Sequence, residues 1–436
     1  MKKGLFKSLI ALTQSELPFR RVERDVELPI DSGSIITVPG VRRAGKSSCL
    51  MIVVNRLLDK GIAKENILWI NFDDERLIDA TTQDLDDVLV AYREMFPDIS
   101  LHDVYMFFDE IQNIPGWDLF VLRVFKSYCK NVFVTGSNAK LLSSEIATQL
   151  RGWTLDFEVL PLSLNEYCRF VGVPVNSYKE TDIARLNVAT EQYMYGGGFP
   201  EVVLETDKSM KIRRLQGYFN TMLFRDLVER HKIRNVEALR YFLKRIMNNL
   251  TKPTSVNNIY NDIRSQGLSI SKDDLYDWAD WATESYLFIR IPKYSMSLVK
   301  ENQSYKKYYV IDNGLRQAVL LQQSSDSGKL LENAVALDLY RHRKPMERIY
   351  YWLDKTECDF VIQQDEKIIQ LIQVSYSLSD VSTKEREIAG IVGVAKATGC
   401  NDLTIVTFDE SGEIENNGYK IKIVKLKDWL LNRAIF

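Results

Sequence analysis

Residues 35–50 read Ile-Ile-Thr-Val-Pro-Gly-Val-Arg-Arg-Ala-Gly-Lys-Ser-Ser-Cys-Leu, and this stretch decides the fold. Between Gly40 and Ser47 it contains Gly-x-x-x-x-Gly-Lys-Ser, the pattern of a phosphate-binding loop. An apolar, β-branched run precedes the loop, and an apolar helical pattern follows it. This strand–loop–helix order is the context in which the pattern indicates a phosphate site rather than an ordinary turn.

The residue types of the loop explain its expected chemistry. Gly40 and Gly45 allow backbone angles and a close approach that side chains would block. Backbone N–H groups of the loop and of the new helix then face an anion. Lys46 can reach the β- and γ-phosphates, and the Ser47 hydroxyl can ligate Mg²⁺. We therefore expect ATP and Mg²⁺ as cofactors, with the nucleotide bound by Gly40, Val41, Arg42, Arg43, Ala44, Gly45, Lys46, Ser47 and Ser48.

Two carboxylates follow a later apolar run, at residues 104–110. The run predicts a buried strand that delivers Asp109 and Glu110 to the carboxyl edge of the sheet, where ligands bind in open α/β folds. This is the form of a Walker B motif. We expect Asp109 to hold Mg²⁺ together with Ser47, and Glu110 to orient the attacking water, so that Glu110 and Lys46 are the catalytic residues.

The strands around these motifs predict a doubly wound parallel sheet. Further strands are expected at residues 67–72, 131–138 and 153–159, with helices between them. Ser137 and Asn138 end one of these strands. In ATPases of this kind a polar residue there senses the γ-phosphate or the water, although a strand that simply ends in a turn explains either residue nearly as well.

The pattern changes after Pro161, and four parts are predicted. Residues 1–160 form the nucleotide-binding core with an N-terminal amphipathic helix, and residues 161–250 form a helical lid. Residues 251–323 read helix, helix, strand, strand, an order that suggests a winged helix. Its second helix is rich in Asp and Glu, which favours packing or protein contact over DNA reading. Residues 324–436 form a mixed α/β domain.

Composition sets outer limits on function. The chain has 436 residues and a net charge of −2, so there is no global attraction to nucleic acid, although a local basic patch remains open. The five cysteines have no paired metal-ligand spacing and suggest a reduced, cytoplasmic protein. No run approaches the length of a membrane span, so no membrane partner is expected.

Several further motifs occur in a fixed order along the chain. They are Phe108-Asp-Glu-Ile-Gln112, Thr135-Gly-Ser137, Leu160-Pro-Leu-Ser163, Gly197-Gly-Phe-Pro200, Phe224-Arg-Asp226 and Tyr309-Val-Ile-Asp-Asn-Gly314. With the phosphate loop, they make the chain resemble a large family of bacterial and archaeal AAA-type (AAA+) ATPases. Members carry an uncharacterised C-terminal region that joins a winged helix to a restriction-endonuclease-like fold of the PD-(D/E)XK type. The resemblance implies an AAA+ core with a helical lid.

The chain departs from this family at two places. The family usually has Gly-Arg near the fifth strand, whereas this chain reads Arg151-Gly152-Trp153, so Arg151 alone could act as an arginine finger. In the nuclease-like part, Glu332 and Asp359 match the expected carboxylates, and Glu357 lies beside the latter. The next strand reads Gln373-Val-Ser375, which lacks both the carboxylate and the lysine of the nuclease motif. We therefore expect a vestigial, inactive nuclease site of Glu332, Glu357, Asp359 and Gln373.

Three functions remain open from the sequence. The first is an ATPase that acts as a switch or remodelling motor on an unknown protein partner. The second is a DNA-binding ATPase with a nuclease-like effector domain. The third is a nucleotide-gated interaction protein with little turnover. The sequence cannot separate it from the first function, because both need the same binding loop. An oligomer is compatible with each of them.

Overall fold

The computed structural model describes residues 2–137, 150, 152–321 and 326–432. The chain forms two compact units, Met1–Leu160 and Pro161–Phe436.

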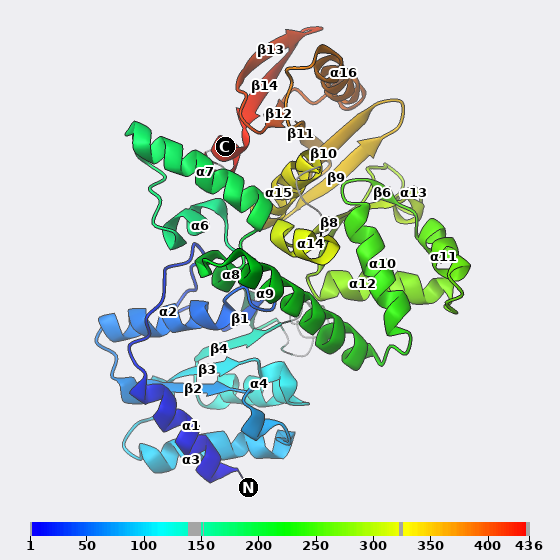
Figure 1. The fold of residues 1–436 in the computed structure, drawn as a ribbon. Coiled ribbons are helices and arrows are strands. Elements are labelled where there is room, and N and C mark those ends of the chain that lie inside the picture. The colour runs from blue at the N-terminus through cyan, green and yellow to red at the C-terminus, as the bar shows by residue number, and fades with distance from the viewer. Residues whose placement is uncertain (1, 138–149, 151, 322–325, 433–436) are drawn as a thin grey trace. The chain divides into compact units, whose positions relative to one another are not determined.

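The first unit is built on a five-stranded parallel sheet in the order β2-β3-β4-β1-β5 (Figure 1). Its inner strands β1 and β4 are mostly apolar and are buried almost throughout, as expected for parallel strands that are covered on both faces. The strands are β1 (Ile35–Pro39), β2 (Ile67–Asn71), β3 (Tyr105–Asp109), β4 (Asn131–Gly136) and β5 (Thr154–Asp156). The helices are α1 (Lys3–Ser15), α2 (Lys46–Asp59), α3 (Leu85–Met95) and α4 (Trp117–Ser127).

Both faces of this sheet are covered. One core contains buried residues of α1, α3 and α4 packed on β2, β3 and β4. On the other face, the rings of Trp69, Phe107 and Phe133 stack from strand to strand, with ring centroids 5.5 and 4.8 Å apart. α2 contacts β4 and lies across the sheet from α1 and α3 (Figure 1). The predicted doubly wound sheet is therefore confirmed, and its strand order brings the ends of β1, β3 and β4 together.

The fifth strand is shorter than the predicted range of residues 153–159. Regular pairing with β1 covers Thr154–Asp156. Beyond it the chain still follows β1, because the N–H groups of Phe157 and Val159 donate to the carbonyls of Thr37 and Pro39 at 2.9 and 2.8 Å.

The first half of the second unit is mainly helical. Ser163 and Glu166 form the predicted capping box at the start of its first helix. One long helix changes to π-helical geometry at η7 (Met222–Glu229). The helices are α6 (Leu164–Phe170), α7 (Glu180–Gly196), α8 (Pro200–Leu204), α9 (Lys208–Thr221), α10 (Val236–Asn248), α11 (Val256–Ser265), α12 (Lys272–Glu284), α13 (Leu298–Gln303) and α14 (Asn313–Leu320).

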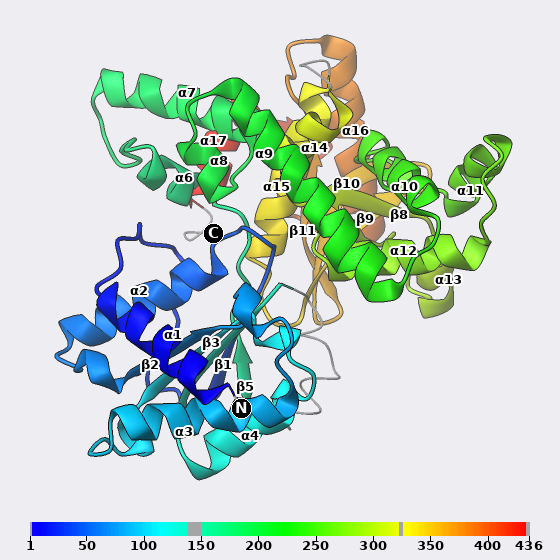
Figure 2. The ribbon, with the colours of Figure 1, turned by 60° about the horizontal axis from the view of Figure 1, so that its bottom comes forward.

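Two sheets complete the second unit. A three-stranded antiparallel sheet in the order β6-β8-β7 contains β6 (Pro253–Thr254), β7 (Phe288–Ile291) and β8 (Lys306–Val310). A six-stranded sheet in the order β13-β14-β12-β11-β10-β9 follows, with α15 (Ser327–Arg341) in contact with β11 (Figure 2). Its other elements are β9 (Glu347–Leu353), β10 (Glu357–Gln364), β11 (Lys367–Val374), α16 (Val381–Thr398), β12 (Leu403–Thr407), β13 (Gly412–Asn416), β14 (Tyr419–Lys425) and α17 (Leu426–Asn432).

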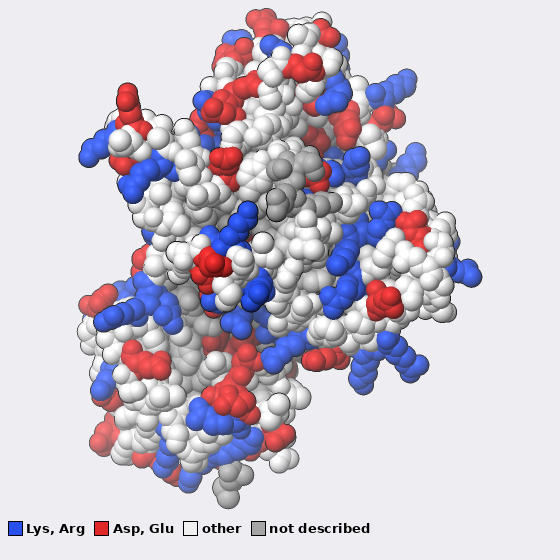
Figure 3. Space-filling model, viewed as in Figure 1, with Lys and Arg blue, Asp and Glu red and all other residues white. Residues whose placement is uncertain are grey.

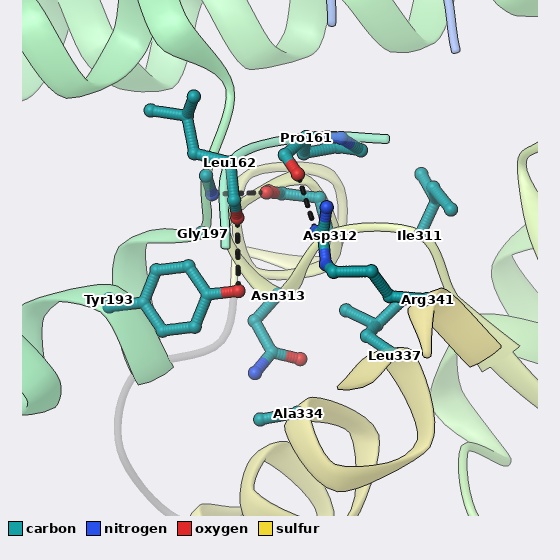
Figure 4. A pocket seen from close by; sticks show the side chains of 11 residues that line it. Pro161, Leu162, Tyr193, Gly197, Ile311, Asp312, Asn313, Ala334, Leu337 and Arg341 are labelled. Atoms are coloured by element: carbon teal, nitrogen blue, oxygen red, sulfur yellow. Dashed lines mark hydrogen bonds between the residues drawn. The ribbon is translucent and has the colours of Figure 1, made fainter. Parts of the chain in front are cut away.

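Two of the quoted motifs meet inside this unit. Asp312 accepts hydrogen bonds from the N–H groups of Gly198 at 2.6 Å and Leu315 at 2.8 Å, so it caps α14 and holds the turn before α8. Gly197 has a φ of 78°, and a Cβ there would lie 2.1 Å from the Asp312 carboxylate. Residues of both motifs line a cavity of about 10 Å³ (Figure 4), which has room for one water molecule. These motifs therefore pack the domain rather than bind a ligand.

Candidate functional site

The loop between β1 and α2 has the backbone that its glycines predict. Gly40 has a φ of 156°, and a Cβ at this position would lie 2.1 Å from the carbonyl oxygen of Val159. Gly45 has a φ of 98° and caps the start of α2. Arg43 also adopts a positive φ, of 68°, which is unusual for a residue with a side chain. The loop therefore packs directly against the backbone of Val159. Gly40 and Gly45 adopt the backbone angles that the shape of the loop requires.

Arg24 supports this loop from below. Its buried guanidinium donates to the carbonyl oxygens of Ala44 at 2.6 Å and of Leu160 at 2.9 Å. Arg24 was missed by the sequence analysis, because nothing in a cluster of basic residues shows which one folds inward.

Lys46 lies at the centre of the site. Its ammonium donates to the carbonyl oxygen of Val41 at 3.3 Å and to the Ser137 hydroxyl at 3.0 Å. It also forms an ion pair with the Glu110 carboxylate at 3.3 Å, and both side chains are largely buried. The first turn of α2 and the ends of β3 and β4 therefore supply one connected polar network.

Glu110 is held by several groups. The Ser137 hydroxyl lies 2.7 and 2.8 Å from its two carboxylate oxygens, and the Gln112 amide donates to it at 2.5 Å. Burial acts to raise the pKa of Glu110, but Lys46, Ser137 and Gln112 outweigh it and lower the pKa to about 2. Glu110 is therefore a charged carboxylate at neutral pH, as the predicted role in water activation requires.

Asp109 and Ser47, the predicted metal pair, are brought together. The two side chains are hydrogen-bonded, and Thr135 donates to the Asp109 carboxylate at 2.5 Å. Burial and the adjacent Glu110 raise the pKa of Asp109 to about 6. A hydroxyl and a carboxylate are oxygen donors of the kind that Mg²⁺ prefers, so the residues present fit this ion.

The fate of the other predicted site residues differs. Val41 and Ala44 are buried, Arg42, Ser47 and Ser48 are half-buried, and Arg43 is exposed. Ser137, one of the two sensor candidates, contacts both Lys46 and Glu110. Asn138 and Arg151 lie outside the described residues. The sequence analysis missed Thr135 and Gln112, although both fall within motifs that it quoted.

A second polar cluster lies in the second unit. Glu332 of α15 and Glu357 and Asp359 of β10 all face one ammonium group, that of Lys307 on β8. The N–O distances are 3.4, 3.5 and 3.1 Å, respectively. Gln373 turns elsewhere, since its amide accepts from the Asp359 N–H and donates to Glu387.

Lys307 supplies a positive charge that the sequence analysis took to be missing. The nuclease motif has its lysine on the strand of Gln373, where this chain has Ser375. The ammonium instead comes from a strand 52 residues before Asp359 along the chain. Burial alone would lower the pKa of Lys307, but Glu332, Asp359 and Glu357 together raise it above its ordinary value.

Comparison with known proteins places the chain in a family. A family model described as "AAA domain" matches residues 32–168, which contain every residue of the first site described above except Arg24. The uncharacterised protein MJ1544 of Methanocaldococcus jannaschii is 33% identical over 442 residues, covering 99% of this chain and 96% of that protein. The chain belongs to the same family as MJ1544. Its AAA domain supports nucleotide binding and hydrolysis at the level of the family.

Other matches include a further relative, two family models and a solved structure. An uncharacterised protein of Haemophilus influenzae is 28% identical, covering 92% of this chain and 95% of that protein. Models described as domains of unknown function, DUF8612 and DUF4143, match residues 187–326 and 327–422. The Walker-type ATPase PABY2304 of Pyrococcus abyssi covers 72% of this chain and 94% of its own, at 15% identity and a TM-score of 0.40.

Among the described residues, no helix is both long and apolar enough to cross a membrane. Within the same ranges, no group of three or more His, Cys, Asp or Glu side chains is arranged to hold a metal ion. The winged-helix and nuclease-like identities of the second unit remain predictions.

Proposed function

We propose that this family member is a Mg²⁺-dependent ATP hydrolase whose nucleotide cycle acts as a switch or remodelling motor on a protein partner. One observation carries the proposal: Lys46, Ser137 and Glu110 form a single hydrogen-bonded group beside the Ser47–Asp109 pair. A phosphate-binding cation, a metal-binding pair and a charged carboxylate thus lie within one site. A site for binding alone would not need the carboxylate.

Each group has a task in this proposal. The loop N–H groups and Lys46 bind the phosphates, and bound Mg²⁺, held by Ser47 and Asp109, would neutralise charge on them. The γ-phosphate competes with Glu110 for Lys46, which frees the carboxylate to accept a hydrogen bond from water. As that water forms a bond to the γ-phosphorus, the bond from this phosphorus to the β–γ bridging oxygen breaks. ADP leaves, and the proton of the water passes by way of Glu110 to the inorganic phosphate that forms.

Two substitutions separate binding from chemistry. Lys46→Ala should lose nucleotide binding, because among the described residues no other lysine ammonium contacts Ser137 or Glu110. Glu110→Gln should bind ATP with little change, because it keeps the shape of the side chain. Binding of a fluorescent ATP analogue to both variants checks this. Loss of ATP binding in Glu110→Gln would contradict the catalytic role assigned to Glu110. If neither the unsubstituted protein nor the variants hydrolyse ATP, the nucleotide-gated interaction protein is favoured.

In the second unit we propose a winged helix and a restriction-endonuclease-like domain that is inactive. The order α11, α12, β7, β8 with the sheet β6-β8-β7 suits the former. The order α15, β9, β10, β11, α16, β12 suits the latter. Incubation of the protein with Mg²⁺ or Mn²⁺ and varied DNA tests the inactivity. Cleavage that disappears in Asp359→Ala would overturn it.

A second candidate function, nucleic-acid binding, is favoured by one surface. Residues 208–245, here called the basic segment, contain eleven Lys and Arg but three Asp and Glu, in a chain whose net charge is −2. Figure 3 shows Lys and Arg gathered over α9 and α10. Exposed members without a carboxylate partner in the described structure include Arg213, Arg230, Lys232, Arg234 and Lys244.

The basic segment also exposes an aromatic ring. Phe224 is 41% exposed in the π-helical stretch, and the Arg240 guanidinium lies 5.8 Å from its centroid. Positive charge with an exposed ring suits a nucleic-acid strand better than the acidic helix α12 does. On α12, Asp280 is already paired with Arg290.

Charge reversal tests this surface. We expect duplex DNA to bind with an affinity that falls steeply with salt, and Lys232→Glu/Lys244→Glu to weaken binding at least tenfold and flatten the slope. The control is Lys384→Glu/Lys420→Glu, which reverses two exposed lysines on the nuclease-like domain. Equal effects of both pairs in an anisotropy titration would exclude the basic segment as the binding surface.

A further inference from the structure

Lys307 is an ammonium group enclosed by carboxylates. Its side chain is 1% exposed, and it contacts acidic groups from a helix and from a strand of the adjoining sheet. The ring of Tyr351 lies 5.4 Å from the ammonium. A buried charge of this kind is tolerated only when it is paired, so the contacts decide the position of Lys307.

The sheet geometry aims Lys307 and Tyr309 at the same cluster. Residues two apart on a strand share a face, and both side chains of β8 meet Glu332: the Tyr309 hydroxyl donates to its carboxylate at 2.7 Å. β8 is fixed on both sides, because Lys307 stands opposite Pro253 of β6 and Ile291 of β7. The ammonium is therefore placed by a paired strand rather than by a mobile loop.

The ammonium stands where a metal ion would be expected in a nuclease-like centre. Carboxylates on the first helix and on the second strand of such a domain converge on a divalent cation. Here Glu332, Glu357 and Asp359 converge on Lys307 instead. Asp359 is held further by the Val374 N–H at 3.0 Å, which aims one of its oxygens away from the centre.

We propose that Lys307 is a tethered cation that replaces the divalent metal ion of this centre. It satisfies the carboxylates permanently, so that the cluster takes up no metal and joins β8 to the α/β domain. The inference deepens the proposed inactive nuclease fold, and it explains the inactivity by a gained lysine as well as by the lost motif residues. It is independent of the ATPase proposal.

Removal of the ammonium has a predictable effect. Lys307→Met keeps the length of the side chain but leaves three carboxylates facing one another without their common partner. A divalent cation then becomes the favourable neutraliser, since oxygen ligands from three side chains surround the vacated position. The variant should gain a metal site that the natural protein lacks.

The experiment is a Mn²⁺ titration of the full chain without nucleotide, followed by electron paramagnetic resonance. We expect Lys307→Met to bind about one more Mn²⁺ per chain than the unsubstituted protein. Lys307→Met/Asp359→Asn should lose that gain. Lys306→Met, at the neighbouring lysine outside the cluster, is the matched control and should gain none. Asp109→Asn identifies any Mn²⁺ bound at the nucleotide site.

Two results would overturn the inference. One is Mn²⁺ binding by the unsubstituted protein that disappears in Asp359→Asn, because the centre would then hold a metal beside Lys307. The other is a folded Lys307→Met that binds no additional Mn²⁺. If Lys307→Met fails to fold, Mn²⁺ binding by the unsubstituted protein and by Asp359→Asn still tests the inference. Equal binding by the two supports it, and weaker binding by Asp359→Asn at this centre overturns it. DNA cleavage is read separately, and cleavage without metal binding at Asp359 would overturn the proposed inactivity while leaving the tethered cation in place.

Discussion

A single hydroxyl, that of Ser137, connects the two charged side chains of the nucleotide site. It touches both oxygens of Glu110 and accepts from Lys46, so it holds the carboxylate and the ammonium in register. We expect Ser137→Ala to lower kcat for ATP hydrolysis roughly tenfold, with a smaller change in KM, because about 1.4 kcal/mol of positioning is lost.

A conservative substitution supplies the control for this prediction. Ser137→Thr keeps the hydroxyl and should retain most of the activity. Steady-state phosphate release over a range of ATP concentrations measures both parameters. A rise in KM alone for Ser137→Ala would assign the hydroxyl to ATP binding and contradict the positioning role.

At the residue scale, the sequence predicted those site residues to which the spacing of a phosphate-loop or Walker B motif assigns a role, but not Thr135 and Gln112, which lie within quoted motifs without an assigned role. Lys46, Ser47, Asp109 and Glu110 follow from two spacings, and the structure brings all four together. Lys307 could not be predicted in this way. It reaches its partners through a strand pairing, and a lysine on a strand is normally read as solvent-exposed.

At the scale of elements, Gly198 is needed because two backbone segments lie in close contact, and not because of its backbone flexibility. A Cβ on Gly198 would lie 2.5 Å from the carbonyl oxygen of Leu162, whose N–H donates to Gly198 at 2.7 Å. Gly198→Ala should lower the free energy of unfolding by about 2 kcal/mol, since two backbone segments must separate.

The neighbouring glycine is the matched control. Gly196 ends α7, is exposed, and has nothing within 4 Å of an added Cβ. Gly196→Ala should change stability by no more than about 0.5 kcal/mol. Urea denaturation of both variants checks the pair, and equal losses would mean that the Gly198 contact is not tight in solution.

Asp312 should give the second unit a stability that depends on pH. Burial raises its pKa to about 7, despite hydrogen bonds from the N–H groups of Gly198, Leu315 and Gly314. The unfolded carboxyl titrates near pH 4. Between about pH 4 and 7 the folded state thus keeps a proton that the unfolded state has lost, so the free energy of unfolding falls as pH rises.

The measurement compares urea denaturation at pH 5 and pH 7. The fall in stability between these values should be smaller for Asp312→Asn, which cannot titrate, than for the unsubstituted protein. An equal fall in both would show that other groups cause the dependence.

Most strands of the first sheet follow from hydrophobic periodicity, whereas the strand β13 of the second unit does not, for a physical reason. The strands of the first sheet were predicted to within a few residues. The edge strand β13 was not, because its Gly-Glu-Ile-Glu-Asn sequence is polar and mostly exposed. Its position is set by pairing with β14, which a local pattern does not contain.

At the scale of the whole molecule, the two polar centres have opposite character. In the first unit, Lys46 is paired with the Glu110 carboxylate, which the γ-phosphate is proposed to displace. In the second, Lys307 is enclosed by three carboxylates and is 1% exposed. The proposed chemistry therefore belongs to the first centre, and the second is proposed to bind its own lysine.

The rate of phosphate release from ATP tests this account most directly. With Mg²⁺, the unsubstituted protein should turn over ATP, and Glu110→Gln should be slower by at least about a hundredfold while still binding nucleotide. Chelation of Mg²⁺ should stop both. Turnover by Glu110→Gln at the rate of the unsubstituted protein would contradict the account, because the carboxylate held by Lys46 and Ser137 would then have no part in the reaction.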